Sequence, residues 1–506
     1  MAMASVSSSA RRGSCRAFQT AAQIVDKDLF LDKALIGGHW TEALSKETFP
    51  VVDPATGNVL TSVPAMDKED ATRAVEAAVG AFHGWKHTTL KERASVLRRW
   101  SALVKSNSKD LSLLMCLESG KPLTEARGEI GYALSFIDFY AGERANGLVI
   151  PPSLPSQRLL VTKEPVGVCS LITPWNFPAA LTTRKAAPAL LAGCSLVLKP
   201  AEDTPLTSLA LAQLAMRAGV PPGVFNVVTT PRELVPGVGG VLSGHPGVRK
   251  VSFTGSTEVG KVLLHQAAGT VKRVSLELGG NAPLVVFDDA KLDLAVEHAL
   301  AAKFRFGGQT CISPNRFFVE EGIHDDFCHK MAERIARLKV GNGADQGTAV
   351  GPLINAAAKE KVAALVEDAI SHGAVAKVGG ALNHEMGPNY FMPTLLVDCP
   401  PHAQICREEI FGPVANVVGF RGVEEAVSVC NSTRSGLAGY VFTQDYAKGL
   451  KFAEAMEVGM VGVNDCNISK EVIPFGGVKE SGLGREGSVL GLDEYLETKH
   501  ICLGGL

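Results

Sequence analysis

The feature that most constrains the fold is a regular alternation of apolar runs and helical patterns between residues 166 and 253. Runs typical of buried strands occur at 166–172, 195–198, 224–228 and 248–253, with helix-like spacing at 179–191, 205–218 and 233–242. Strand–helix–strand units of this kind build a doubly wound parallel sheet, that is, an α/β fold. Such sheets bind ligands outside the carboxyl ends of their strands, so we expect the functional site at that edge.

A second alternating region follows, and a helical region precedes the first. Helical patterns cover residues 71–82 and 90–117. Strand candidates of the second region lie at 284–287, 316–319, 394–397, 414–418 and 439–442, and the glycine-rich tail from Phe475 reads as loop and then strand. A chain of 506 residues is too long for one simple core, so two or three domains are expected.

The composition narrows the function classes. Apolar residues make up 46% of the chain, charged residues 20%, and the formal net charge is -2, as in soluble globular proteins. The absence of a basic stripe argues against nucleic-acid binding, and no apolar run is long enough to cross a bilayer. The 11 cysteines show no C-x-x-C pair and no metal-like Cys/His spacing, which predicts reduced thiols and no metal site.

The first 25 residues differ from the rest of the chain. They contain Arg11, Arg12 and Arg16, serines at 5, 7, 8, 9 and 14, and no acid before Asp26. This composition is typical of a transit peptide, with the mitochondrion favoured over the plastid, and not of a secretory signal. The alternative is an unprocessed, disordered tail.

Three side chains together suggest a chemistry. Cys311 follows a glycine-rich turn, Glu277 is a lone carboxylate before Gly279-Gly280, and Asn176 lies in Pro174-Trp175-Asn176-Phe177. A thiol, a base and an amide donor suffice for covalent attack on an aldehyde carbonyl. Each also has a structural interpretation, namely a buried thiol, a carboxylate that ties down a strand end and a turn asparagine.

Two strand ends suggest a nicotinamide cofactor. After the run that ends at residue 253, Gly255 permits close backbone approach and Ser256 can cap the next helix, whose N-terminus suits a pyrophosphate. Lys199 and Glu202 follow another strand, where a carboxylate can bind both ribose hydroxyls and repel a 2′-phosphate; this favours NAD over NADP. Helix capping alone and a surface Lys/Glu turn are the alternatives.

With these residues in view, the chain resembles the aldehyde dehydrogenase superfamily from about residue 35 to the C-terminus. The resemblance implies a Rossmann-type cofactor domain, an α/β catalytic domain and a small β oligomerisation extension. It places the NAD-binding domain at 26–148 and 168–279, the catalytic domain at 280–479 and the extension, through which a homodimer or homotetramer forms, at 149–167 and 480–506. The motifs that carry it are Pro174-Trp175-Asn176-Phe177-Pro178, Phe253-Thr254-Gly255-Ser256, Leu276-Glu277-Leu278-Gly279-Gly280, Gly308-Gln309-Thr310-Cys311 and Glu409-Ile410-Phe411-Gly412-Pro413.

The resemblance also implies roles. Cys311 would be the nucleophile, Glu277 the general base, and Asn176 with the Cys311 backbone N–H the oxyanion hole. Hydride passes to NAD+ to leave a thioester, and hydrolysis is favoured over transfer to coenzyme A because a base is present. The implied cofactor-binding residues are Trp175, Lys199, Glu202, Gly255, Ser256, Glu409 and Phe411.

Within the superfamily the resemblance is closest to the succinate-semialdehyde dehydrogenases. Arg184 falls eight residues after Asn176 and Arg305 six before Cys311, so we expect both near the pocket mouth, where two guanidiniums would bind a carboxylate. Either arginine could instead form a structural ion pair. The resemblance adds Ser469 to the carboxylate site.

The implied reaction is NAD-dependent oxidation of succinate semialdehyde to succinate, as in GABA degradation. The alternatives are oxidation of a longer semialdehyde such as glutarate semialdehyde, oxidation of general aldehydes, and a non-catalytic protein on this fold. Two departures from the branch bear on this. Ser313 stands where a second, redox-active cysteine is often found, and Phe306 stands in place of the usual asparagine, where a bulky ring could reshape the pocket.

Overall fold

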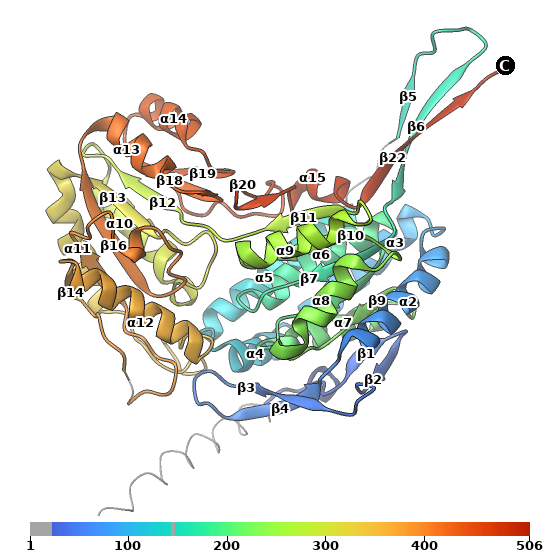
Figure 1. The fold of residues 1–506 in the computed structure, drawn as a ribbon, viewed down its shortest axis with the longest axis horizontal. Coiled ribbons are helices and arrows are strands. Elements are labelled where there is room, and N and C mark those ends of the chain that lie inside the picture. Colours follow the sequence, from blue (N-terminus) through green and yellow to red (C-terminus); the bar gives the residue numbers. More distant parts are fainter. Residues whose placement is uncertain (1–22, 143–146, 384, 506) are drawn as a thin grey trace, which may run out of the picture.

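The chain forms two α/β lobes and a narrow β arm that projects from the first lobe (Figure 1). The structure is a computed structural model, and it describes residues 23–142, 147–383 and 385–505. The predicted transit segment therefore lies almost wholly outside the described residues. No helix in the described ranges is long and apolar enough to span a membrane.

The first lobe contains the predicted doubly wound sheet. Its order is β2-β1-β9-β8-β7-β10-β11-β21, and the strands from β9 to β11 run parallel. The four strands predicted from the sequence are confirmed within one or two residues. The strands are β1 (Ala34–Ile36), β2 (His39–Thr41), β7 (Val168–Ile172), β8 (Ser195–Lys199), β9 (Phe225–Val227), β10 (Val248–Thr254), β11 (Arg273–Glu277) and β21 (Gly482–Leu483).

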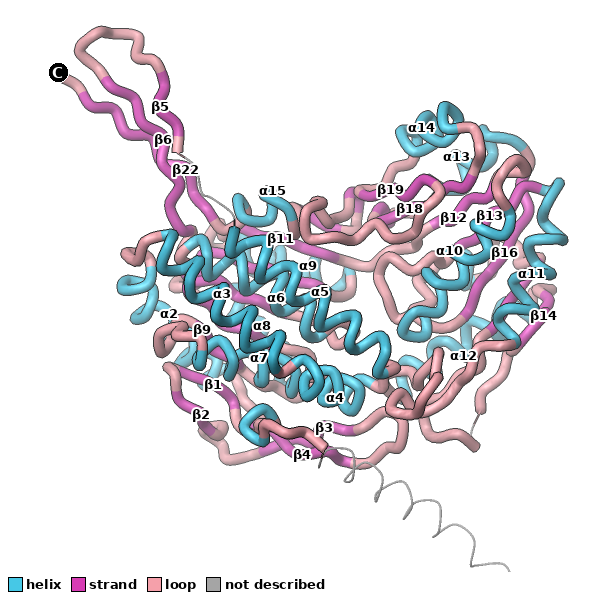
Figure 2. Tube along the Cα trace, turned by 180° about the vertical axis from the view of Figure 1, so that it is seen from behind, coloured by secondary structure: helices cyan, strands magenta, loops and turns pink. Residues whose placement is uncertain are grey.

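Helices cover both faces of this sheet, which explains why β7 and β8 are buried at every position. Helices α2, α8 and α9 lie on one face and α6 and α7 on the other, with α3, α4 and α5 behind α6 and α7 (Figures 1 and 2). The helices are α2 (Lys68–Trp85), α3 (Leu90–Ser106), α4 (Ser108–Ser119), α5 (Leu123–Gly142), α6 (Pro178–Ala192), α7 (Pro205–Arg217), α8 (Val235–Gly244) and α9 (Thr257–Ala268).

Helix α6 is buried along its whole length because α5 and α3 cover the face that the sheet leaves free. It begins with Pro178, whose fixed φ suits the first helical position. The turn between β7 and α6 holds Asn176 at the carboxyl edge of the sheet. The sequence predicts one helix at 90–117, but the structure has two. Asn107 is both the C-cap of α3 and the N-cap of α4, so the helix is interrupted there.

The second lobe is built on a seven-stranded sheet of order β14-β15-β16-β13-β12-β18-β19, and it contains all five predicted strands. Its strands are β12 (Pro283–Val286), β13 (Arg316–Glu320), β14 (Val375–Val378), β15 (Thr394–Val397), β16 (Val414–Phe420), β18 (Ala438–Phe442) and β19 (Met460–Val463). Its helices are α10 (Leu292–Phe304), α11 (His324–Ala336), α12 (Ala356–Ser371), α13 (Gly422–Asn431) and α14 (Tyr446–Ala455).

The arm is a three-stranded antiparallel sheet of β5 (Leu148–Ile150), β6 (Arg158–Pro165) and β22 (Leu496–Leu503). Only the last part of the tail segment 480–506 joins it. The preceding β21 pairs with β11, and α15 (Ser488–Asp493) packs on α6, so residues 482–493 belong to the first lobe and not to the extension.

Candidate active site

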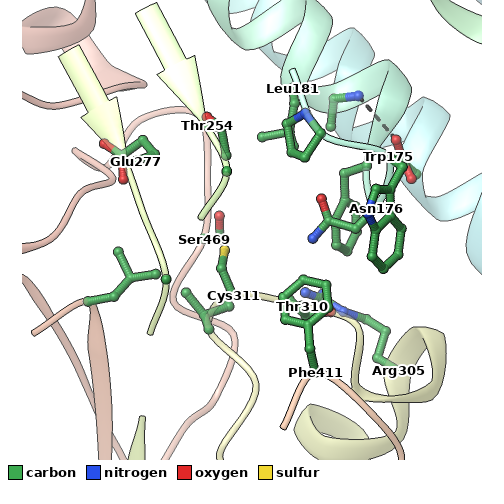
Figure 3. A pocket seen from close by; sticks show the side chains of 18 of the residues that line it. Trp175, Asn176, Leu181, Thr254, Glu277, Arg305, Thr310, Cys311, Phe411 and Ser469 are labelled. Carbon is green, nitrogen blue, oxygen red and sulfur yellow. Dashed lines mark hydrogen bonds between the residues drawn. The ribbon is translucent and has the colours of Figure 1, made fainter. Parts of the chain in front are cut away.

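A cavity of about 560 Å³ lies between the two lobes at the carboxyl edge of the first sheet, where the sequence predicts the site. In Figure 3, Cys311 lies between Glu277 on one side of the cavity and Asn176 on the other. Lys199 and Glu202 lie outside the cavity lining. The other predicted site residues line it together: Trp175, Asn176, Arg184, Gly255, Ser256, Glu277, Arg305, Cys311, Glu409, Phe411 and Ser469.

The loop that carries Cys311 depends on glycine. It follows the short 3₁₀ turn η3 (Arg305–Gly308), in which Gly308 has a φ of 75°. A Cβ on Gly308 would lie 2.1 Å from the carbonyl oxygen of Gly412, so no larger residue fits. The turn delivers a half-buried thiol to the cavity.

The Cys311 thiol is protonated at neutral pH in the free protein. Burial raises its pKa to about 12, although the charge of Arg184 opposes the shift. The thiolate is the nucleophilic form of cysteine, so the raised pKa keeps the Cys311 thiol weakly reactive in the free protein. A positively charged nicotinamide ring beside the sulfur would lower this pKa.

Alkylation of Cys311 by iodoacetamide is therefore expected to accelerate with pH. The thiolate fraction grows about tenfold per pH unit below the pKa, so the rate should keep rising between pH 7 and pH 9. Peptide mass spectrometry of samples taken over time measures the alkylation rate. Bound NAD+ should shift the increase in this rate to lower pH. A plateau below pH 9 in the free protein would contradict the raised pKa.

Glu277 ends strand β11, and its carboxylate is buried at 2% exposure. Neither carboxylate oxygen has a hydrogen-bond partner among the described residues. Burial raises its pKa well above the usual range, and the charge of Glu486 adds to the shift. Gly476 leaves room beside it, since a Cβ there would lie 3.0 Å from Glu277 Oε1. In its ionised form, an unpartnered carboxylate with a raised pKa is a stronger base than an ordinary one and can take a proton from water.

Asn176 is buried, and its side chain points to the loop of Cys311. Its Nδ2 donates a hydrogen bond to the carbonyl oxygen of Gln309 at 3.0 Å. The second Nδ2 hydrogen is available to an oxyanion in the cavity. The Asn176 backbone oxygen accepts a hydrogen bond from Lys121 Nζ at 2.8 Å.

The two arginines lie differently from each other. Arg184 is 3% exposed, not at the pocket mouth as predicted, and its Nε lies 2.8 Å from Glu486 Oε2. It is buried because it lies on α6, which is covered on all sides. Burial alone would lower the pKa of Arg184, but the Glu486 carboxylate raises it. Arg305 is exposed, with its guanidinium carbon 5.4 Å from the centre of the Phe177 ring.

Phe306 does not line the cavity. Its ring is 1% exposed and lies behind the cavity wall, in edge-on contact with Trp175 and Phe177 at 6.2 and 6.4 Å between ring centres. Phe306 therefore borders the cavity only through Trp175 and Phe177, which line it, and its effect on the shape of the pocket stays a prediction.

Several lining residues had no motif to reveal them in the sequence. Tyr132, on α5, shares a hydrogen bond between its hydroxyl and that of Ser469. Lys361, on α12, donates from Nζ to the backbone oxygen of Glu409 at 2.7 Å. Glu125 and Lys121 also line the cavity. All four come from helices or helix ends whose local sequence shows only ordinary helical or turn residues.

Five of the seven predicted cofactor residues line the cavity, namely Trp175, Gly255, Ser256, Glu409 and Phe411. Ser256 lines the cavity and caps α9 by accepting from the backbone N–H of Val259 at 3.3 Å, so the N-terminus of that helix, which suits a pyrophosphate, begins at the cavity. Glu409 accepts from the backbone N–H of Gly280 at 3.1 Å, and burial raises its pKa to about 7. Its remaining oxygen can accept from a ribose hydroxyl. In the described ranges, no group of three or more His, Cys, Asp and Glu side chains could hold a metal ion.

Comparison with known proteins agrees with this geometry. The sequence model of the aldehyde dehydrogenase family matches residues 40–501. The chain is 50% identical over 481 residues to the NADP-dependent succinate-semialdehyde dehydrogenase of Escherichia coli, covering 95% of this chain and 99% of that protein. It is 50% identical over 483 residues to the glutarate-semialdehyde dehydrogenase of Pseudomonas putida, with the same shares covered. Relatives from Arabidopsis thaliana and Rattus norvegicus are named as mitochondrial.

A solved structure shows the same fold. The succinate-semialdehyde dehydrogenase of Burkholderia pseudomallei superposes with a TM-score of 0.93 at 50% identity, and the match covers 95% of this chain and 100% of that one. Because the family match spans most of the sequence and both lobes superpose, the chain belongs to the aldehyde dehydrogenase family, whose members are NAD(P)-dependent enzymes.

Proposed function

We propose that this enzyme oxidises succinate semialdehyde to succinate with NAD. The observation that carries the proposal is the set of groups around Cys311. The same cavity holds an exposed arginine, Arg305, a buried one, Arg184, and the hydroxyl of Ser469. Guanidinium and hydroxyl donors bind a carboxylate, which succinate semialdehyde carries at the end opposite its reacting carbon.

The chain's own residues support each step of the reaction. The Cys311 thiol gives its proton to solvent and its sulfur bonds to the aldehyde carbon, while the carbonyl oxygen becomes an oxyanion that accepts from Asn176 Nδ2 and the Cys311 backbone N–H. A nicotinamide beside this carbon would supply the hydride acceptor, and the predicted cofactor residues Trp175, Glu409 and Phe411, which line the cavity, would hold it there. Loss of the hydride leaves a thioester between the Cys311 sulfur and the acyl group. Water attacks this thioester while Glu277 takes a proton from the water. The sulfur leaves, and the acid is released.

Glutarate semialdehyde is the second candidate. It has the same two end groups with one more methylene, and relatives of equal identity are named for each substrate. One methylene changes discrimination by only about 1–3 kcal/mol in a pocket. A panel of both semialdehydes and the uncharged butanal, read by NADH absorbance, separates the candidates by kcat/KM.

Replacing Arg305 by leucine is expected to lower kcat/KM for succinate semialdehyde by about 10- to 100-fold, because a charge-assisted pair contributes about 1.5–3 kcal/mol. The value for butanal should stay within about twofold, since butanal has no carboxylate to bind. The matched control is Arg421→Leu, an exposed arginine paired with Glu321 in the second lobe. An unchanged ratio of the two kcat/KM values would contradict the carboxylate site.

Replacing Glu202 by serine is expected to shift the preference toward NADP. The Glu202 carboxylate lies 3.6 Å from Lys199 Nζ at the end of β8, where it would accept from the ribose hydroxyls and repel a 2′-phosphate. The ratio of kcat/KM for NAD to that for NADP should fall by about tenfold or more. Glu454→Ser, an exposed carboxylate on α14, is the control. A ratio that stays constant would assign NAD preference to other residues.

The arm and the N-terminal segment complete the proposal. The arm exposes Leu148, Val149 and Ile150 at 63%, 76% and 41%, an apolar surface that suits contact with another copy in an even-numbered homo-oligomer.

The arginine- and serine-rich first 25 residues would direct the enzyme to the mitochondrion. Light scattering gives the assembly size, and a fluorescent fusion of that segment gives the location.

A further inference from the structure

The ammonium group of Lys121 lies buried beside the proposed oxyanion hole. Lys121 follows α4 and is 1% exposed. Its Nζ pairs with the carboxylate of Glu129 and donates to the backbone oxygen of Asn176 at 2.8 Å. The same Nζ lies 3.9 Å from the centre of the Phe177 ring and 4.4 Å from that of Phe306. We call these two rings the aromatic clamp.

Glu129 joins this ammonium to the first turn of α6. Its other carboxylate oxygen, Oε1, accepts from the backbone N–H groups of Ala179 and Ala180 at 2.9 and 3.2 Å. A carboxylate at a helix N-terminus is favoured by the free N–H groups and the helix dipole. The buried Lys121–Glu129 ion pair therefore contacts the backbone on both sides of Phe177. Lys121 binds the carbonyl oxygen before it, and Glu129 binds the N–H groups after it.

Phe306 links the loop that carries Cys311 to Lys121, because its ring contacts the Lys121 ammonium group. Its φ of 48° and ψ of 38° lie in the left-handed region, which costs a non-glycine residue free energy. Hydrogen bonds hold it there. Its N–H donates to Glu125 Oε2 at 2.7 Å, and its carbonyl accepts from the backbone N–H and Nε2 of Gln309 at 3.2 and 3.1 Å. Gln309 in turn accepts from Asn176 Nδ2 through its carbonyl oxygen.

We infer that Lys121 and Phe306 are positioning residues for the oxyanion donor. The ammonium, held against the ring faces of the aromatic clamp, fixes the Asn176 backbone relative to the loop that ends at Cys311. A buried cation over a desolvated ring is attracted to the ring's negative face. Phe306 thus acts on the reaction through Lys121 and Asn176 and not by touching substrate. This inference rests on the proposed role of Asn176 as oxyanion donor.

The test begins with Phe306→Leu, which keeps an apolar side chain and removes the ring face. We expect kcat to fall by about five- to tenfold, while KM for the aldehyde and for NAD changes by less than about twofold. The reason is that the oxyanion forms only during the reaction, so a displaced donor affects the transition state and not substrate binding. Phe306→Met, which fills the ring volume with a flexible chain, replaces the leucine variant if that one fails to fold.

Phe287→Leu is the matched control. Phe287 is 1% exposed, and Lys448 Nζ lies 4.5 Å from its ring centre, but it belongs to the second lobe and does not line the cavity. It loses a buried ring and a cation–ring contact, as Phe306→Leu does. We expect kcat of the folded Phe287→Leu enzyme to stay within about twofold. An equal loss of kcat in this variant would assign the effect to general packing and overturn the inference.

A double variant asks whether Phe306 acts through Asn176. In an Asn176→Ala background, Phe306→Leu should lower kcat no further, because the donor is already absent. If the two losses multiply, Phe306 acts by another route and the inference is wrong. Asn176→Ala alone tests the proposed function separately: an unchanged kcat in that single variant would remove Asn176 from the oxyanion hole. All rates are measured with succinate semialdehyde and with butanal, so a failed carboxylate site does not mimic either result.

Discussion

Replacing Cys311 by alanine is expected to abolish aldehyde oxidation, with a loss in kcat of about 10⁴-fold or more, because no covalent intermediate can form without the sulfur. Cys311 is the half-buried thiol that lies between Glu277 and Asn176 in the cavity (Figure 3), where we propose it as the nucleophile. NAD binding should persist, since no predicted cofactor residue is changed. Stopped-flow absorbance at the start of the reaction should show no NADH.

Cys466→Ala is the control for that variant. Cys466 is also half-buried and precedes the loop of Ser469, but it does not line the cavity. Its removal should leave kcat within about twofold. A Cys311→Ala enzyme that keeps more than about 1% of the activity would show that the sulfur is not the nucleophile.

Replacing Glu277 by glutamine is expected to lower steady-state kcat by about 10³-fold and to preserve the first turnover. Acylation needs the thiol and the oxyanion donors, whereas release of the acid needs a base for water. One NADH per active site should therefore form rapidly, after which the thioester accumulates. Rapid mixing measures the burst, and mass spectrometry of the quenched enzyme detects the acyl group on Cys311.

Hydroxylamine distinguishes this result from damage to the site. As a strong nucleophile it attacks a thioester without a general base, so it should restore turnover in Glu277→Gln. An absent burst would show instead that Glu277 is needed before the thioester forms. In the unaltered enzyme, the raised pKa of Glu277 means that the protonated, inactive form persists to higher pH than for an ordinary glutamate. The rate of acid release should accordingly increase with pH through that pKa.

The alternation of apolar runs was enough to predict the core of both sheets. β7 and β15 were found because fully buried strands read as continuous apolar segments bounded by turns. Helix α5 was not predicted, since Gly128 and Gly131 lower its helix propensity and its apolar residues do not form one stripe. It is helical because α3, α4 and α6 pack around it, which is tertiary information.

The same distinction applies to the site. Cys311, Glu277 and Asn176 lie in motifs with glycine, tryptophan and proline neighbours, which gave each a local signal. Lys121, Tyr132 and Glu486 reach the cavity region only because distant elements pack together. Glu486, the ion-pair partner of Arg184, lies 302 residues further along the sequence. The residues next to Arg184 in the sequence therefore could not predict its burial.

The route of the last residues has a consequence for biosynthesis. Glu486 supplies the carboxylate that pairs with both Arg184 and Lys185, and β22 completes the arm against β6, a strand made more than 330 residues earlier. A ribosome therefore releases most of the first lobe while two buried cations still lack their counter-ion and β6 has an open edge. Final assembly of that lobe waits for the end of translation, and a nascent chain has a long interval in which chaperones can engage it.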